Sequence, residues 1–149
     1  MPDKRLITFE VIQDLLVSST LTLTALYVSE ADVSAMIMLK EISFAWVVNI
    51  IIGFTVPERK FGEYISKKLK LKKIQSFLLT MFVIVFINVT GISSCVVLKN
   101  VGINKQFFDV WVGLFPILLG VGYIAAILWY PDTDRIVGAI FKEKSKKRI

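Results

Sequence analysis

The chain has 149 residues, of which 55% are hydrophobic, and a mean hydropathy of +0.68, which is too apolar for a water-soluble domain with one core. Its net charge is +6, but the basic residues lie in blocks between apolar stretches, which favours a membrane surface over nucleic acid as the partner. One cysteine and no histidine exclude an internal disulfide, a Cys/His metal site within one chain and a His-dependent catalytic pair, and we expect no cofactor.

Four stretches are apolar and long enough to cross the ~30 Å hydrocarbon layer of a bilayer, which takes about 20 helical residues. We predict membrane spans at residues 7–28, 33–56, 74–98 and 108–130. The first two contain charged residues, whereas the central parts of the third and fourth contain none. The sequence therefore predicts four crossings.

The first span has a second interpretation as a cleaved signal peptide. Lys4 and Arg5 precede its apolar run, and residues 33–35 resemble a cleavage site. Glu10 and Asp14 within the run argue against this interpretation, so we expect the span to be a transmembrane helix.

The distribution of Lys and Arg predicts the topology. Two precede the first span, seven lie between residues 56 and 73, and six follow residue 130, whereas three lie in or beside the other connections. Positive residues concentrate on the cytoplasmic side of membrane proteins. We therefore expect both termini and the central loop in the cytoplasm.

The two halves of the chain follow the same plan. Each half has two spans, a tryptophan in or beside the second (Trp46, Trp111), a proline after it (Pro57, Pro131) and a basic segment. We predict an all-α integral membrane protein with four transmembrane helices, arranged as two parallel hairpin repeats that are each followed by a basic amphipathic interfacial helix. The two units cover residues 1–73 and 74–149.

The segments after the two prolines have the pattern of helices that lie on a membrane surface. Phe61, Tyr64 and Ile65 share one face of the first, and Ile136 and Ile140 share one face of the second. Basic residues on the remaining faces are expected to contact anionic headgroups, each contributing about 1 kcal/mol, with docking of a cytoplasmic partner as the alternative. The predicted lipid contacts are Arg59, Lys60, Lys67, Lys68, Lys70, Lys142 and Lys144.

Polar side chains within the spans form a candidate intramembrane site, because unsatisfied polar groups are costly in hydrocarbon. The members of this site are Asn49, Asn88, Lys40 and Glu41. The two amides either hydrogen-bond between helices or ligate an ion or solute through their carbonyl oxygens. Lys40 and Glu41 either snorkel or form a local ion pair, or they line a cavity.

The first span carries two further polar patterns. Glu10 and Asp14 form one acidic face, which either pairs with the basic segments or takes up protons or cations. Thr20 and Thr24 share a face, and we expect their hydroxyls to bond to carbonyls one turn back, with a polar pathway as the alternative.

The fourth span contains Pro116, which removes the hydrogen bond to the carbonyl of Val112 and is expected to kink the helix. Gly113 and Gly120 lie on one face of the same span. A face of small residues admits close packing, so we predict a tight helix contact there, with a hinge as the alternative.

The repeat resembles a bacterial family of short helical-hairpin membrane units, domain of unknown function number 2798. In the second unit the resemblance lies in residues 88–91 (Asn-Val-Thr-Gly), Trp111, Pro131, Ile136 and Ile140. The first unit matches through Trp46, Pro57, Phe61 and Ile65, and has Leu23 and neighbouring threonines in place of the Asn and Gly. The resemblance implies a bacterial inner-membrane protein with two hairpin units, and it implies no catalytic residues.

Two functional hypotheses remain open. The first is a noncatalytic multi-pass protein that acts as an accessory or structural subunit through helix packing and a basic cytoplasmic face. The second is a small oligomeric transporter or channel for an ion or small solute. The expected partners are the lipid bilayer with anionic headgroups, and either further copies of the chain or a larger membrane protein. Convergence of the intramembrane polar residues on a cavity would favour transport.

Overall fold

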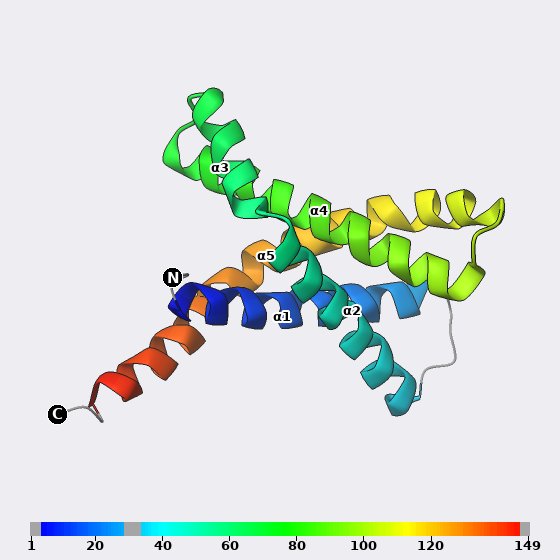
Figure 1. Cartoon of the computed structure of the whole chain (residues 1–149), viewed down its shortest axis with the longest axis horizontal. Helices are drawn as coiled ribbons and strands as arrows, with labels where there is room; N and C mark the ends of the chain where they lie inside the picture. Colours follow the sequence, from blue (N-terminus) through cyan, green and yellow to red (C-terminus); the bar gives the residue numbers. More distant parts are fainter. Residues whose placement is uncertain (1–3, 29–33, 147–149) are drawn as a thin grey trace.

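The computed structural model describes residues 4–28 and 34–146, and this part of the chain is all-helical (Figure 1). Its helices are α1 (Lys4–Val28), α2 (Ala35–Thr55), α3 (Glu58–Lys68), α4 (Lys73–Val101) and α5 (Gln106–Lys146). All except α3 are long and apolar enough to cross a membrane, in agreement with the four predicted spans.

The start of α1, the end of α5 and the α3–α4 turn lie at one end of the molecule, which we call the terminal end. The end of α1, the start of α2 and the α4–α5 turn lie at the opposite end, the loop end (Figure 1). An even number of crossings requires this arrangement, and it places the basic blocks of the sequence at the terminal end.

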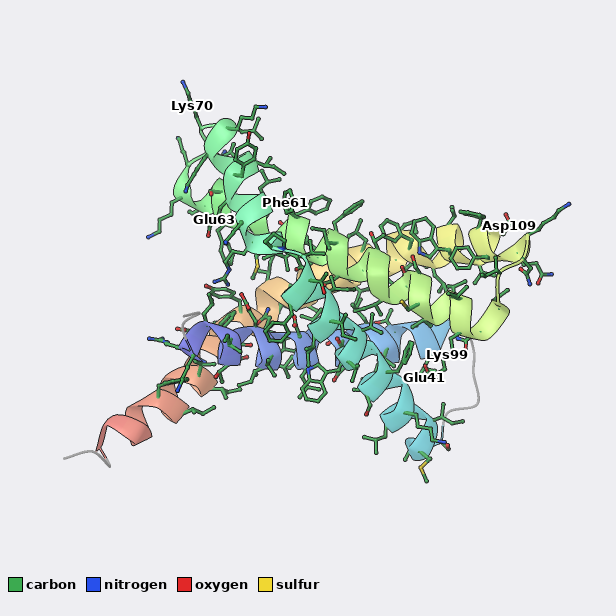
Figure 2. All side chains as sticks on the ribbon, viewed as in Figure 1. Glu41, Phe61, Glu63, Lys70, Lys99 and Asp109 are labelled. Atoms are coloured by element: carbon green, nitrogen blue, oxygen red, sulfur yellow. The ribbon has the colours of Figure 1, made fainter. Side chains whose placement is uncertain are left out.

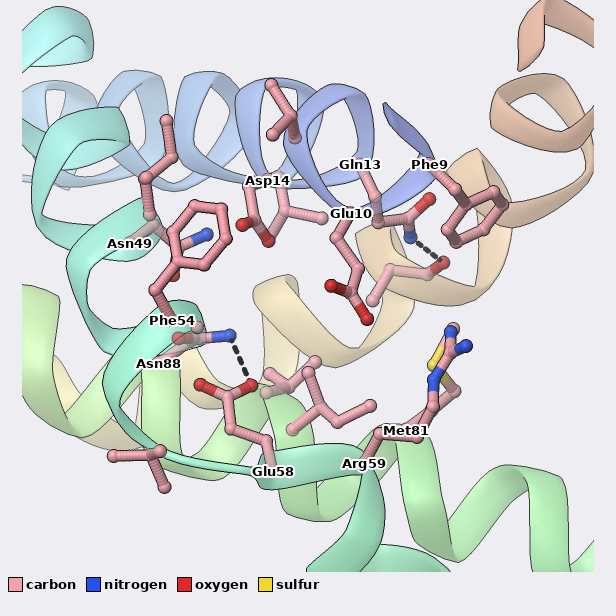
Figure 3. Close-up of a pocket in the computed structure, with 18 of the residues that line it drawn as sticks. Phe9, Glu10, Gln13, Asp14, Asn49, Phe54, Glu58, Arg59, Met81 and Asn88 are labelled. Atoms are coloured by element: carbon pink, nitrogen blue, oxygen red, sulfur yellow. Dashed lines mark hydrogen bonds between the residues drawn. The ribbon is translucent and has the colours of Figure 1, made fainter. Parts of the chain in front are cut away.

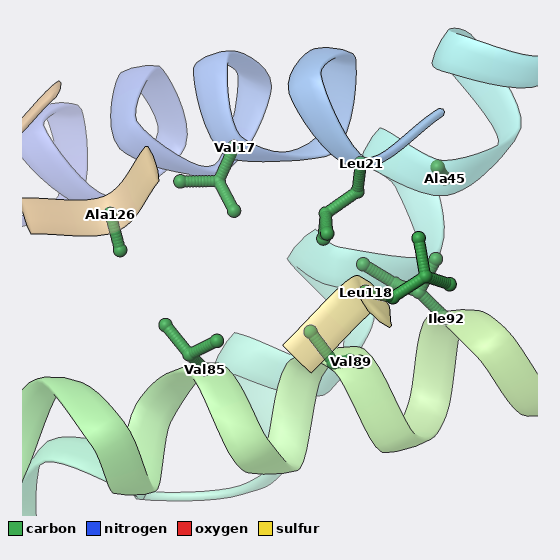
Figure 4. Packing of buried hydrophobic residues seen from close by; sticks show 8 residues of the cluster. All are labelled: Val17, Leu21, Ala45, Val85, Val89, Ile92, Leu118 and Ala126. Atoms are coloured by element: carbon green, nitrogen blue, oxygen red, sulfur yellow. The ribbon is translucent and has the colours of Figure 1, made fainter. Parts of the chain in front are cut away.

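The helices pack around one apolar cluster (Figure 4). The cluster consists of Val17 and Leu21 of α1, Ala45 of α2, Val85, Val89 and Ile92 of α4, and Leu118 and Ala126 of α5. The helix pairs in contact are α1 with α2, α4 with α5, α1 with α5, α2 with α4, and α3 with α4. Each helix of one predicted hairpin therefore also contacts a helix of the other.

The short helix α3 packs lengthwise against the first half of α4, rather than lying apart as a surface helix. A Cβ added at Gly62 would lie 2.8 Å from the Cα of Thr80, and the Ser66 hydroxyl donates to the carbonyl of Ser76 at 3.3 Å. These small residues let the two backbones approach closely. The apolar face of α3 that contains Phe61 and Tyr64 stays exposed, as its amphipathic pattern indicated (Figure 2).

The direction of α3 follows from the breaks at its two ends. Val56 is extended (φ −107°, ψ 121°) before Pro57, and α3 then continues roughly in the direction of α2 toward the terminal end. Beyond α3 the chain reverses through a turn in which Lys70 adopts a left-handed φ of 51°. Proline cannot continue the hydrogen bonding of α2, so the helix is interrupted there.

The fourth span does not end at Tyr130. Helix α5 runs without interruption through Pro116 and Pro131 to Lys146, so the predicted separate interfacial helix after Pro131 is the last part of α5. Contacts with α1 hold this part in line, because Asp134 pairs with Arg5 at 3.3 Å and the rings of Tyr130 and Phe9 are 5.0 Å apart. Tertiary packing thus overrides the helix-breaking tendency of the second proline.

The close contact of α5 is made by a different glycine from the two predicted. Within the described part of the chain, no atom lies within 4 Å of a Cβ added at Gly113 or Gly120. A Cβ added at Gly122 would instead meet Leu21, Val89 and Val85 at 3.1 to 3.3 Å. The glycine spacing indicated a small-residue face, but α1 and α4 pack on the nearly opposite face, because two residues turn a helix by about 200°.

Candidate functional site

The predicted amides Asn49 and Asn88 converge on one cavity of about 400 Å³ in the terminal half of the bundle (Figure 3). Asn49 comes from α2 and is 1% exposed, while Asn88 comes from the middle of α4 and is 6% exposed. The cavity lies between α1, α2, α4 and the start of α3, with Ala126 contributed by α5. A volume of this size is in the range of small-molecule sites in proteins.

Glu58, the first residue of α3, closes the cavity opposite α1. It is 6% exposed, and its Oε2 accepts a hydrogen bond from the Asn88 amide nitrogen at 3.0 Å. The pKa of Glu58 is raised to about 8. The largest cause is burial, and the negative charges of Asp14 and Glu10 also raise the pKa, whereas the hydrogen bond from Asn88 lowers it. The carboxyl group is therefore largely protonated at neutral pH.

Glu58 was not among the predicted members of the site. A signal was nevertheless present. Glu58 follows Pro57 directly at the end of an apolar stretch, where the helix must break. Charged residues within or next to apolar spans are commonly functional.

Helix α1 adds Glu10, Gln13 and Asp14 to the lining. The Gln13 amide nitrogen donates to the carbonyl of Ala126 at 2.8 Å, which leaves its oxygen facing the cavity region without a donor. In the described part of the chain, four buried lining oxygens have no hydrogen-bond partner: Gln13 Oε1, Asn49 Oδ1, Glu58 Oε1 and Asn88 Oδ1. Such groups are rare in proteins, so a cluster of four acceptors indicates a place for a donor or a cation.

The other two predicted members of the site lie elsewhere. Glu41 pairs with Lys99 of α4 near the loop end, and Lys40 is exposed (Figure 2). The ammonium group of Lys99 also lies 4.9 Å from the ring centre of Phe44. Glu41 therefore forms an ion pair between α2 and α4, not a pair with Lys40, and it also lines a second cavity.

A second cavity of about 360 Å³ occupies the loop half of the bundle. Thr22, Glu41, Ser93 and Asn100 contribute its polar side chains. Leu21 and Val89 line both cavities, and they are 2% and 1% exposed. The two cavities therefore meet at an apolar contact between α1 and α4, next to Gly122.

The predicted lipid contacts divide into two groups. Arg59 and Lys60 line the first cavity, whereas Lys67, Lys68 and Lys70 are exposed at the terminal end of α3 (Figure 2). The side chains of Lys142 and Lys144 lie outside the described side chains. Thr20 and Thr24 bond to the carbonyls of Leu16 and Thr20, which confirms their predicted bonding one turn back.

The all-helical fold, with four helices long and apolar enough to cross a membrane, is compatible with a multi-pass membrane protein. No protein-family model, curated protein or solved structure matches the chain. The resemblance to the hairpin-repeat family stays a prediction.

Proposed function

We propose that the protein is a small transporter or channel, in which a solute crosses the membrane through the two cavities of the bundle. The observation that carries this proposal is the pair of cavities in opposite halves, which share only a narrow apolar lining at Leu21 and Val89. Apolar constrictions between polar vestibules act as gates, because water leaves them readily. We also propose that the protein is noncatalytic, since its sequence contains no histidine for a His-dependent catalytic pair.

The depth of the polar cluster supports this proposal. Asn88 lies eleven residues before Lys99 on α4, which is about 16 Å along the helix. If Lys99 and its partner Glu41 mark one surface of a ~30 Å layer, Asn88 of α4 lies near the midplane. Solute and ion sites of transporters commonly lie at this depth, where unpaired polar groups would otherwise be too costly.

We further infer that the terminal end faces the cytoplasm of a bacterial inner membrane. The concentration of Lys and Arg at this end supports the orientation. In this orientation Lys67, Lys68 and Lys70 reach anionic headgroups, while the exposed apolar side chains of α3 face lipid.

An accessory or structural subunit is the second candidate. The outer face of α2 favours it, because Val47 and Ile51 are 52% and 58% exposed on a helix that contributes little to the core. Such a face suits lipid, a second copy of the chain or a larger membrane protein. An oligomer is compatible with both candidates.

Flux through reconstituted liposomes tests the transport proposal. Leu21→Ala shortens the side chain at the junction of the cavities, so we expect faster flux of a permeant cation or small solute, by about tenfold if the barrier falls by ~1.4 kcal/mol. Leu15→Ala is the matched control, because Leu15 lies on the same helix, is partly exposed and lines neither cavity. Its flux should equal that of the wild type.

The measurement uses liposomes loaded with a panel of monovalent ions and small neutral and charged solutes. Selective flux in the wild type that increases in Leu21→Ala alone supports the proposal. If the wild type and Leu21→Ala both gave the same flux as protein-free liposomes for every solute in the panel, the transport proposal would be overturned and the accessory subunit would be favoured.

A further inference from the structure

We propose that the cavity in the terminal half binds an organic monocation, with a substituted ammonium or phosphonium centre on an apolar body, next to the buried carboxyl group of Glu58. The inference rests on the proposed transport function and specifies its substrate class. It is carried by the donors and acceptors of the cavity, by its volume and by its lining.

The polar atoms without partners select for positive charge. Glu58 is more than nine-tenths buried, and its carboxylate points into the cavity toward Asn88 (Figure 3). In the described part of the chain, the oxygens at the cavity without a hydrogen-bond partner include Oε1 of Glu58, Oδ1 of Asn88 and Oδ1 of Asn49. Carboxylate and amide oxygens accept hydrogen bonds and attract cations, whereas an anion would find repulsion from all of them.

The volume and lining select an organic cation over a metal ion. A metal ion needs several oxygen ligands within about 2.6 Å, and no group of three or more Asp, Glu, Cys or His in the described residues could hold one. The cavity of about 400 Å³ is far larger than a bare ion, and Phe9, Met81 and Val85 contribute apolar walls. An apolar body carrying one positive charge fits such walls and oxygens together.

The surrounding charges favour a monocation that replaces a proton. Glu10 and Asp14 of α1 and Glu63 of α3 add negative charge around Glu58, while Arg59 and Lys60 of α3 add positive charge. At neutral pH the raised pKa of Glu58 keeps its proton on the carboxyl group. When the cation binds, the O–H bond breaks, the carboxylate stays beside the cation, and one proton leaves to solvent, so the charge of the cavity is unchanged.

Binding of methyltriphenylphosphonium to the detergent-purified protein tests the inference. Calorimetry in buffers of different ionisation enthalpy measures both affinity and proton release. We expect release of about one proton per bound cation at pH 7. The affinity for the probe should therefore increase as pH is raised toward 8, by up to about tenfold per pH unit. Sodium, potassium and magnesium ions at equal concentration should not displace the probe.

Glu58→Gln should weaken binding by about 30-fold or more and abolish proton release, because the amide neither carries charge nor titrates. Glu58→Asp keeps a carboxylate and should retain proton release, which separates loss of charge from loss of folding. Asp109→Asn is the matched control, since Asp109 is exposed at the opposite end of the molecule, and its binding should be unchanged (Figure 2).

The outcomes separate this inference from the transport proposal. Unaltered probe binding in Glu58→Gln, binding without proton release, or no binding by the wild type would each overturn the inference. Solute or ion flux without probe binding would leave transport standing and overturn only the organic cation. Proton-releasing probe binding without any flux would support the cation site and contradict the transport proposal.

Discussion

At the scale of single residues, Glu58 combines burial, one hydrogen bond and two negative neighbours. Only the Asn88 amide stabilises its charged form, whereas burial and the charges of Asp14 and Glu10 favour the protonated form. The folded protein therefore holds a proton that the unfolded chain, with an ordinary Glu pKa of ~4.3, releases. This difference links the stability of the fold to pH.

The stability contributed by protonated Glu58 should be present at acidic pH and should be lost as pH rises from about 4.3 toward the folded pKa of about 8. We expect the melting temperature of the detergent-solubilised wild type to fall by about 3 °C or more between pH 6 and pH 9, relative to Glu58→Gln. Thermal unfolding followed by circular dichroism at several pH values measures this difference. Parallel pH profiles for the two proteins would contradict the assignment of the proton to Glu58.

At the scale of helices, the contact of α3 with α4 decides where Glu58 lies. Gly62 and Ser66 form the face of α3 that meets Ser76 and Thr80, and this contact directs the start of α3 toward Asn88. Because the nearest atom to an added Cβ at Gly62 belongs to the backbone of α4, the contact cannot adapt by a side-chain rotation alone.

Gly62→Ala should therefore lower the free energy of unfolding by about 1–3 kcal/mol, since the two helices must separate to admit the methyl group. Gly138→Ala is the matched control: Gly138 is also helical, and an added Cβ meets no described atom within 4 Å. This control should be neutral or stabilising by up to about 1 kcal/mol. Melting temperatures of the two variants in detergent provide the comparison, and equal effects would argue against the α3–α4 contact.

At the scale of the whole molecule, the two halves make corresponding contacts. Helices α1 and α4 come first in their halves of the chain, and α2 and α5 are the second long helices. The α1–α5 contact of one pair thus corresponds to the α4–α2 contact of the other, and both contacts are present. Helix α5 contacts the first turn of α1 just after Pro131 and then extends past it, whereas α3 after Pro57 packs along α4 (Figure 1). The duplication itself stays a prediction, and the proline interrupts the helix only in the first half.

The orientation of the molecule can be measured by cysteine labelling. In a Cys95→Ser background, Lys105→Cys at the loop end should react with an impermeant maleimide added outside intact cells. Lys68→Cys at the terminal end should react only after the membrane is opened. Both positions are exposed in the structure, so accessibility within the fold is matched. The reverse pattern would invert the proposed orientation.

Local properties of the sequence determined the helix content, the number of apolar spans and the bonding of the threonines. Hydrophobic length and hydroxyl-to-carbonyl bonding depend on neighbours within about one turn, so they can be read without knowledge of the fold. The sequence also identified Asn49 and Asn88 as a polar pair, because amides are conspicuous in apolar spans.

Only the tertiary structure decided which faces meet. The contact of Gly122 with α1 and α4, the continuation of α5 past Pro131, and the separation of Glu41 from the two amides all depend on partners far away in the chain. The same is true of Glu58, which joins Asp14 and Asn88 because α3 turns back along α4. Helix packing in a membrane is set by the shapes of small-residue faces, which hydropathy and charge do not encode.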